Sequence, residues 1–363
     1  LNVTQARTIE ALGNSGTNAY VVADTISNVL TAPSSVVNSA TAVSTSDATL
    51  TVAQANSLVS KYGAAKVSDT SFVISDTAAN LMGASAAAIA EAQAAGGVTV
   101  LAGGTATVAQ ALAINTAAGT KLDKTTVDIS DTAANVLAAT ADATNGAVVD
   151  TMNSITLSDA ATVSQITDIN ADLAGFAGGI ATAEVATGYA LTDTAANLIA
   201  AGALGANGIL DDAGTVTISG ATSVANVILV QTEMARTAPA VTLGTNLVYS
   251  LSDTATNVLS AVVAEAAVKT GAASISVTGT STGVQAAALV ALANFDDVYT
   301  ISGNVADLGN VAVTAAIKQG AVSVTMSDTV AALEAGASAA LAITDVDTII
   351  ISDVLGAAGI GGA

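Results

Sequence analysis

Aspartates that are adjacent or one residue apart are the residues of this sequence best suited to chemistry. They form three pairs, Asp211 with Asp212, Asp296 with Asp297, and Asp345 with Asp347. Paired carboxylates serve glycosidases as acid and base, and carboxylate oxygens are ligands that calcium prefers. Adjacent side chains point apart, and no aromatic platform for a sugar accompanies these pairs. The pattern therefore favours peripheral calcium binding over catalysis.

The residue types that are missing exclude most catalytic classes. The 363 residues include no His and no Cys, which excludes the usual zinc sites, Ser-His-Asp and Cys-His catalysis, common haem ligation and disulfides. With 29 acidic residues against 8 basic ones, the net charge is −21, which disfavours phosphate backbones and anionic membrane surfaces. We expect no enzyme, no required cofactor and no nucleic-acid partner, with calcium as the one candidate ion.

The mean hydropathy of +0.64 is high, yet no stretch of the sequence resembles a membrane span. A span needs about 20 strongly apolar residues. The longest apolar windows, such as 81–95 and 258–268, are short, rich in Ala and interrupted by Glu91 and Glu265. We therefore expect no membrane insertion.

The elements that must position these side chains are set by an internal repeat. The phrase Ile74-Ser-Asp-Thr-Ala-Ala-Asn-Leu81 recurs closely at 129–136, 191–198 and 251–258, with degenerate copies between. Thirteen anchors, aligned on the Asp of this phrase from Asp24 to Asp353, lie about 27 residues apart. Repeats of this length are typical of stacked arrays, because one unit alone cannot bury its apolar face.

Each repeat changes its period at the anchor. Positions four and two residues before the anchor are apolar, as in Phe72 and Ile74, and the position just before it is mostly Ser or Thr. This alternation predicts a short strand with one buried face. An Ala-rich run such as 78–95 follows, which predicts a helix.

The anchor aspartates stand where a helix N-cap belongs, so we expect each to accept from the first turn of its own helix. These expected caps are Asp24, Asp76, Asp131, Asp159, Asp193, Asp253, Asp328 and Asp353. A ladder of shared calcium ions is the alternative that explains the Gly and Ser/Thr positions less well. An Asn four residues after the anchor is expected to bond backbone groups of a neighbouring repeat. These residues are Asn28, Asn56, Asn80, Asn135, Asn197 and Asn257.

The predicted fold class is α/β, as a solenoid of about thirteen strand–turn–helix units. Successive strands should pair in parallel, with Ala-rich helices on one face of the ribbon. Close-packing Ala helices reduce the mismatch between strand spacing and helix spacing. We expect residues 1–363 to form a single solenoid domain, as an excerpt or as one segment of an assembly.

Two alternating phrases carry a resemblance. The first is the Ser-Asp-Thr-Ala-Ala-Asn-Leu phrase, and the second is Thr49-Leu-Thr-Val-Ala-Gln-Ala-Asn56, echoed at 105–112. Together they resemble repeat segments of large secreted bacterial surface proteins, which include adhesins, surface-layer proteins and RTX-like exported proteins. The resemblance implies an extracellular or cell-surface location and export by type I secretion. The Gly-Gly-x-Gly-x-Asp calcium nonapeptides of RTX proteins are missing from the sequence.

These observations favour a structural extracellular protein that assembles with itself into a surface layer or filament. The last strand of the repeat, 349–351, is three isoleucines followed by Ser and Asp353, and an apolar end of this kind stacks on more protein. A stalk segment of a giant adhesin is the alternative, and a carbohydrate-active enzyme on a solenoid groove is a remote one. The expected partners are further copies of the chain and cell-surface polysaccharide.

Overall fold

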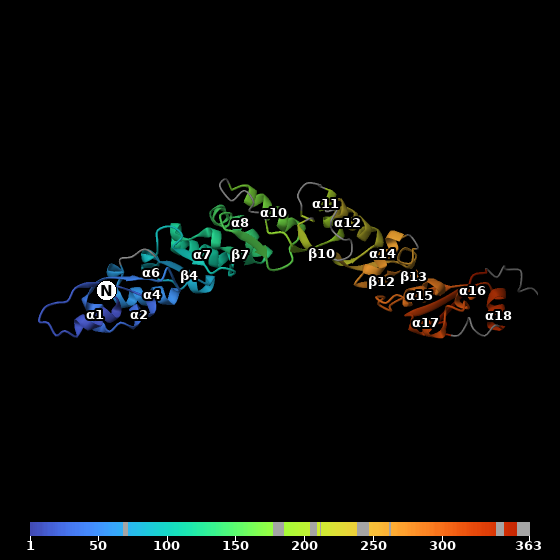
Figure 1. The fold of residues 1–363 in the computed structure, drawn as a ribbon. Helices are drawn as coiled ribbons and strands as arrows, with labels where there is room; N and C mark the ends of the chain where they lie inside the picture. Colours follow the sequence, from blue (N-terminus) through green and yellow to red (C-terminus); the bar gives the residue numbers. More distant parts are fainter. Residues whose placement is uncertain are drawn as a thin grey trace, which may run out of the picture. The chain divides into compact units, whose positions relative to one another are not determined.

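The structure is a computed structural model that describes residues 1–67, 72–176, 185–203, 209–210, 212–237, 247–260, 263–338 and 345–353. It is a mixed α/β structure with several parallel sheets and many helices (Figure 1). Contacts divide the chain into two compact units, Leu1–Tyr189 and Ala190–Ala363. Each unit is described by itself.

The N-terminal unit alternates short strands with short helices. Its strands are β1 (Tyr20–Asp24), β2 (Ala40–Thr45), β3 (Thr49–Leu50), β4 (Val73–Asp76), β5 (Val98–Val100), β6 (Thr105–Ala106), β7 (Asp128–Asp131) and β8 (Ser154–Leu157). Its α-helices are α1 (Val3–Glu10), α2 (Ile26–Thr31), α3 (Ser34–Ser39), α4 (Val52–Tyr62), α5 (Ala78–Leu81), α6 (Ala86–Glu91), α7 (Val108–Ala118), α8 (Ala133–Thr140), α9 (Ala143–Val149) and α10 (Val163–Ala174). Three 3₁₀ turns complete it, η1 (Ala64–Lys66), η2 (Gly119–Lys121) and η3 (Lys124–Thr126).

The C-terminal unit repeats this alternation. Its strands are β9 (Tyr189–Asp193), whose first residue belongs to the N-terminal unit, β10 (Ala213–Thr222), β11 (Leu247–Thr254), β12 (Ser274–Thr278), β13 (Thr280–Ser281), β14 (Thr300–Gly303), β15 (Ser323–Asp328) and β16 (Thr348–Ile351). Its helices are α11 (Ala195–Ala203), α12 (Val224–Thr237), α13 (Ala255–Val258), α14 (Val263–Gly271), α15 (Gly283–Val290), α16 (Val305–Leu308), α17 (Ala315–Gly320) and α18 (Val330–Ser338). A strand together with the helices that follow it is called a strand–helix segment below.

The strands form five sheets in which neighbours are consecutive in sequence. The orders are β1-β2, β3-β4-β5 and β6-β7-β8 in the N-terminal unit, and β9-β10-β11-β12 and β13-β14-β15-β16 in the C-terminal unit. The pairs β4–β5, β7–β8, β11–β12 and β14–β15 are all parallel, which confirms the predicted parallel pairing of successive strands. Parallel neighbours require a crossover, and the Ala-rich helices supply it.

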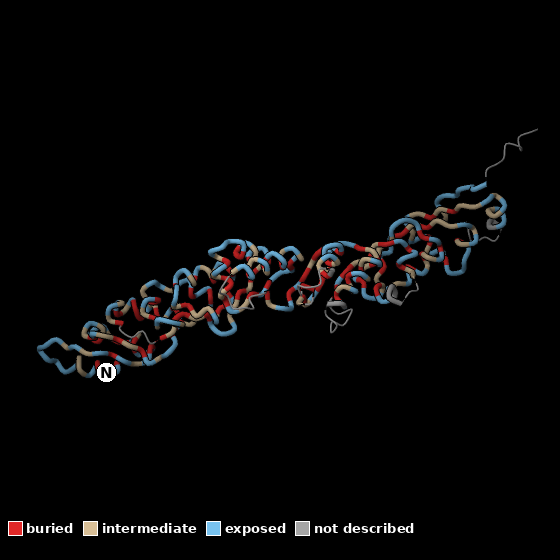
Figure 2. Tube along the Cα trace, turned by 90° about the horizontal axis from the view of Figure 1, so that it is seen from above, coloured by how far each residue is buried: buried red, intermediate tan, exposed pale blue. Residues whose placement is uncertain are grey.

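The core consists of the apolar strand positions that stack from one strand to the next. Leu50 pairs with Ile74 and Ile74 pairs with Val98, and each is buried to at least 99%. In the C-terminal unit Ile301 pairs with Val324 in the same way. Figure 2 shows buried stretches alternating with exposed ones along the trace. The period-2 apolar pattern before each anchor therefore marks the buried face.

Two glycine turns interrupt strands that the repeat pattern treats as continuous. Gly103 has a φ of 79° and separates β5 from β6, and Gly279 has a φ of 75° and separates β12 from β13. This left-handed conformation favours glycine. As a result β5 pairs with the strand before it and β6 with the strand after it, in different sheets. The alignment of the repeat on Gly104 is therefore shifted relative to the observed register.

The helix expected over 78–95 is split into α5 and α6. Asn56 of the preceding segment accepts from the Ser85 N–H at 2.9 Å and donates to the Gly83 carbonyl at 3.0 Å. Ser85 then begins α6 as its N-cap, with its hydroxyl accepting from the Ala88 N–H at 3.1 Å. A polar contact from a neighbouring segment thus outweighs the helix propensity of the Ala run.

The sequence predicts no membrane insertion, and the length and apolar character of the helices bear on this expectation. Within the ranges given above, none combines the length and the apolar character that crossing a bilayer requires.

Candidate functional site: carboxylates between neighbouring segments

In the described part of the chain, nine aspartates each accept a hydrogen bond from the first residue of a helix that lies earlier in the sequence. The pairs are Asp24 with Val3, Asp47 with Ile26, Asp76 with Val52, Asp131 with Val108, Asp159 with Ala133, Asp253 with Val224, Asp307 with Gly283, Asp328 with Val305 and Asp353 with Val330. Donor and acceptor are 21 to 29 residues apart, so each bond joins neighbouring segments. These nine residues are called the bridging aspartates.

The strand register explains why an aspartate reaches this position. Ala106 pairs with Ile129, and two residues further along each chain stand Val108, where α7 begins, and Asp131. The sheet ladder stops at the helix, and the carboxylate continues it by accepting the next N–H. The first N–H groups of a helix have no partner within the helix, so the bridging bond satisfies one of them.

Asp131 shows the complete arrangement. Its Oδ2 accepts from the Val108 N–H at 2.9 Å, and its Oδ1 accepts from the Thr132 N–H at 2.8 Å and from Asn135 Nδ2 at 2.7 Å. The side chain is buried, and three donors surround it. Asp24, Asp76 and Asp253 have the same three kinds of donor.

These bonds favour the charged carboxylate. For Asp24 the bond from Asn28 is the largest cause that holds the pKa below its ordinary value, and the Val3 N–H acts in the same direction. For Asp76 and Asp131 burial raises the pKa, but the bonds from the Asn side chain and from the two N–H groups outweigh it, so the pKa of each is lowered. These three bridging aspartates are therefore acceptors and not proton donors at neutral pH.

The expectation that the anchor aspartates are N-caps of their own helices is wrong in detail. The N-cap is the Thr one residue later, for example Thr25, Thr77, Thr132 and Thr254, whose hydroxyl accepts from the N–H three residues on. Thr194 and Thr329 accept in the same way. Asp159 stands three residues before the N-cap of α10, Thr162. The residues after Asp353 lie outside the described ranges.

Asp24, Asp76, Asp131, Asp159, Asp253, Asp328 and Asp353 bridge to the previous segment instead. Asp193 accepts from the Thr194 N–H and from Asn197 Nδ2, both at 2.7 Å. The physical reason is that a Thr side chain one residue closer to the helix already serves the first turn. The carboxylate is then left facing the neighbouring strand.

The asparagines divide into two groups. Asn56 bonds backbone groups of the next segment, as expected. The others donate to the anchor carboxylate of their own segment, four residues earlier, and the expectation of bonds between segments is wrong for them. These are Asn28, Asn80, Asn135, Asn197 and Asn257. A carboxylate within reach is a stronger acceptor than a neighbouring carbonyl.

Four segments without the Asp-Thr phrase begin a helix with a reciprocal capping box. Thr51 with Gln54, Thr107 with Gln110, Thr162 with Gln165 and Thr282 with Gln285 each bond side chain to backbone in both directions. For α4, α7 and α15 the bridging aspartate of the next segment then supplies the acceptor for the first helical N–H.

The few basic residues also join segments, at the opposite ends of the helices. Lys61 Nζ donates to the Leu30 and Ala32 carbonyls at 2.6 and 2.7 Å. Lys121 Nζ donates to the Ala90 and Ala92 carbonyls, both at 2.6 Å. Cations at helix C-termini satisfy unpaired carbonyls and favour the helix dipole. Sequence reasoning missed this role, although the 60-residue spacing of the two lysines was a usable signal.

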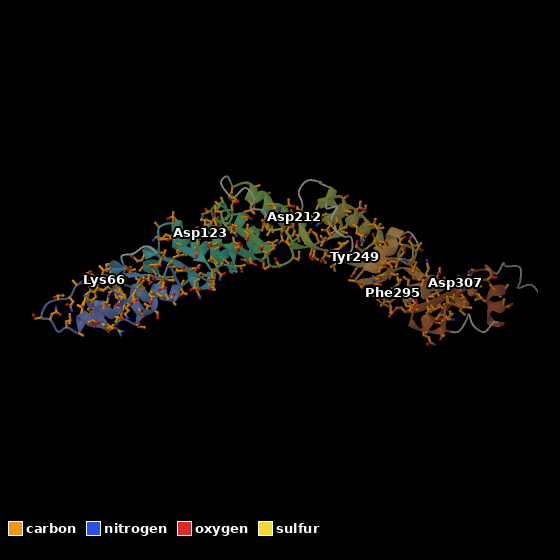
Figure 3. All side chains as sticks on the ribbon, in the orientation of Figure 1. Lys66, Asp123, Asp212, Tyr249, Phe295 and Asp307 are labelled. Atoms are coloured by element: carbon orange, nitrogen blue, oxygen red, sulfur yellow. The ribbon has the colours of Figure 1, made fainter. Side chains whose placement is uncertain are left out.

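Three further contacts were missed. Asp47 and Asp307 bridge without belonging to the anchor phrase. Tyr249, labelled in Figure 3, donates its hydroxyl to the Val268 carbonyl at 2.8 Å, beside Gly271, where a Cβ would lie 2.7 Å from that hydroxyl. The Tyr position of the repeat followed by a Gly some 20 residues later could have indicated this contact.

The calcium candidates that the structure describes do not gather into a cluster. Asp296 and Asp297 are exposed neighbours, Asp345 accepts from Gln319 Nε2 at 3.1 Å, and Asp347 accepts from the Val324 N–H at 2.8 Å. Asp212 is half-buried, and Asp211 lies outside the described residues. Over the described ranges, no group of three or more acidic, His or Cys side chains is placed to hold a metal ion.

The last described strand carries apolar side chains that are open to solvent. Ile349 pairs with Met326, which is fully buried, yet Ile349 is 48% exposed. Ile350 and Ile351 are 49% and 55% exposed. By its pairing with Met326, Ile349 occupies a strand position whose side chain is buried in the neighbouring strand β15.

Comparisons with known proteins add no relative to this arrangement. No protein-family model matches the sequence, and no curated protein or solved structure is significantly similar to it.

Proposed function

We propose that this chain is a structural repeat protein of the bacterial cell exterior. In this proposal about thirteen strand–turn–helix units stack into one α/β solenoid over residues 1–363, and the solenoid associates with itself into a surface layer or filament. Export by type I secretion and contact with cell-surface polysaccharide belong to the same proposal, through the sequence resemblance described above.

The bridging aspartates are the observation that carries the proposal. The acidic residues are the abundant ionisable side chains of this sequence, and in the described part of the chain nine aspartates hold neighbouring segments together. Asp24, Asp76 and Asp131 each have a lowered pKa and accept from three N–H groups, which makes them good structural links and poor acid catalysts. The carboxylates of these residues thus serve to hold stacked segments together.

The exposed face of β16 supports self-association. Burying the half-exposed Ile349 and Ile351 against a further strand would contribute about 2 kcal/mol together, at roughly 25 cal/mol per Å² of apolar surface. Among the described strands β16 pairs only with β15, and its other edge would gain backbone hydrogen bonds from another strand. Another segment of the same kind provides both.

The test is to image the purified chain by electron microscopy, once with millimolar calcium and once with a chelator. Filaments or sheets support the proposal, and their loss on chelation assigns a bridging calcium to the exposed aspartates. Monodisperse particles at every concentration and in both conditions overturn self-assembly and favour the adhesin stalk.

A pair of variants separates the β16 edge from general surface hydrophobicity. Replacing Ile349 and Ile351 by Asp should abolish the assemblies and leave the far-ultraviolet circular dichroism unchanged. The control is Val311→Asp, because Val311 is 98% exposed in the loop between α16 and α17. If the control abolishes assembly as fully as the β16 variant, the edge is not the contact.

A further inference from the structure

The nine bridging contacts all run in the same direction along the chain. In each pair the carboxylate belongs to the later segment and the helix that it completes belongs to the earlier one. A segment therefore receives its acceptor from the segment that follows it. The bonds that a helix start receives from its own segment, through Thr or a capping box, do not replace this contact, because they serve different N–H groups.

Breaking such a contact has unequal consequences on its two sides. Ala133, whose N–H donates to Asp159 at 2.7 Å, is 1% exposed, so its N–H loses the acceptor that the described structure gives it at a largely buried position. Asp159 is exposed, and its carboxylate returns to water. An unsatisfied buried donor costs far more than a solvated carboxylate, whereas the apolar contacts between the segments are lost equally by both.

We propose that the bridging aspartates give each unit a directional coupling, in which the order of a helix start depends on the segment that follows it. When one segment opens, the helix start of the segment before it loses its acceptor and opens more readily. The helix start of the segment after it keeps its own acceptor from further along the chain. The bridging aspartates are positioning residues for stacking, and the coupling does not depend on self-assembly.

Asp159 is suited to a test of directional coupling, because its bridging bond can be removed without changing the N-cap of the helix in its own segment. The carboxylate accepts from Ala133 N–H at 2.7 Å in α8, while α10 in its own segment begins at the N-cap Thr162. Asp142 is a matched control: it is also exposed, but it caps its own helix α9 by accepting from the Thr144 and Asn145 N–H groups.

The experiment is hydrogen exchange on the full chain, read by mass spectrometry with fragmentation that resolves single amides. Asp159→Ala should speed exchange of the Ala133 amide about tenfold, the effect of losing one buried hydrogen bond, and leave the first turn of α10 unchanged. Asp159→Asn should speed it less, because the amide oxygen still accepts. Asp142→Ala should speed exchange only at Thr144 and Asn145.

The opposite pattern overturns the proposal. Faster exchange in α10 with no change at Ala133, or equal changes on both sides of Asp159, would show that the coupling has no direction. No change at Ala133 in either Asp159 variant would show that the bond does not hold the helix start. Asp328→Ala repeats the test in the C-terminal unit, where the Val305 amide should respond.

Discussion

The substitution Gly146→Ala would produce two physical effects of opposite sign on stability. It lies inside α9, where Ala is favoured over Gly by about 1 kcal/mol, so helix propensity predicts that Gly146→Ala stabilises the chain. A Cβ at this position would lie 2.4 and 2.6 Å from ring carbons of Phe176 and 2.7 Å from the Thr140 carbonyl oxygen. The ring can move, but the carbonyl belongs to the backbone of the last turn of α8.

The steric effect should be the larger one. Overpacking of this kind costs about 1–3 kcal/mol, and the backbone contact places this site at the upper end of that range. After the gain in propensity the net loss is about 2 kcal/mol, which corresponds to roughly 30-fold faster exchange of protected α9 amides. The Asp150 amide, bonded to the Gly146 carbonyl at 2.8 Å, is a suitable reporter.

The assay is hydrogen exchange, which reads local opening without assuming that the whole chain unfolds in one step. Ala147→Gly is the control, because Ala147 is exposed in the same helix and should lose only about 1 kcal/mol through propensity. Combining Gly146→Ala with Phe176→Ala should recover part of the loss, as a positive coupling in a double-mutant cycle. A stabilised Gly146→Ala variant, or a coupling of zero, would refute the steric reasoning.

Three further predictions follow from buried or bridging polar groups. Ser281 is 1% exposed and its hydroxyl has no partner within the described structure. Ser281→Ala should therefore raise the stability of the chain by about 1 kcal/mol, measured as slower hydrogen exchange in α15. A loss of stability would contradict this prediction. A carboxyl whose pKa is lowered on folding adds stability above its unfolded pKa of about 4, and that stability is lost as the pH falls through the folded value. The lowered pKa of Asp131 thus predicts that thermal melts weaken steeply below about pH 4, and that Asp131→Asn weakens them at pH 7 and flattens the acid slope; an unchanged slope would exclude this carboxyl. Lys121→Met should lower the stability of the chain by about 1 kcal/mol and speed hydrogen exchange at the end of α6. Lys124→Met is the comparison, because Lys124 donates to the Thr151 hydroxyl and to no helix-end carbonyl in the described structure. Equal effects of the two substitutions would contradict this prediction.

Periodicity was sufficient to predict the element types. The alternation around Phe72 and Ile74 predicts a strand and the Ala run after it predicts helix, and the structure has β4 and α5 there. Parallel pairing followed from the same repeat, because similar strand–helix units in succession give every strand the same direction, and the helices are long enough to serve as crossovers. Local sequence therefore determined what the elements are.

The partners of the polar side chains were not predictable in the same way. Asp and Thr are both good N-caps, and the phrase Asp76-Thr77 places them side by side, so the sequence alone does not show which one serves the helix. The answer depends on the register with the preceding strand, which places Asp76 opposite Val52. The break at Gly83 likewise depends on a contact with a neighbouring segment, the bonds from Asn56.

The bridging bonds also determine how the chain responds to tension. Each one closes a loop of 21 to 29 residues, and a stretched chain of that length spans about 70–100 Å at roughly 3.4 Å per residue. Segments held mainly to their neighbours detach one after another under load, so a pulled molecule should lengthen in a staircase of such increments. Each step would dissipate work while the remaining segments stay folded.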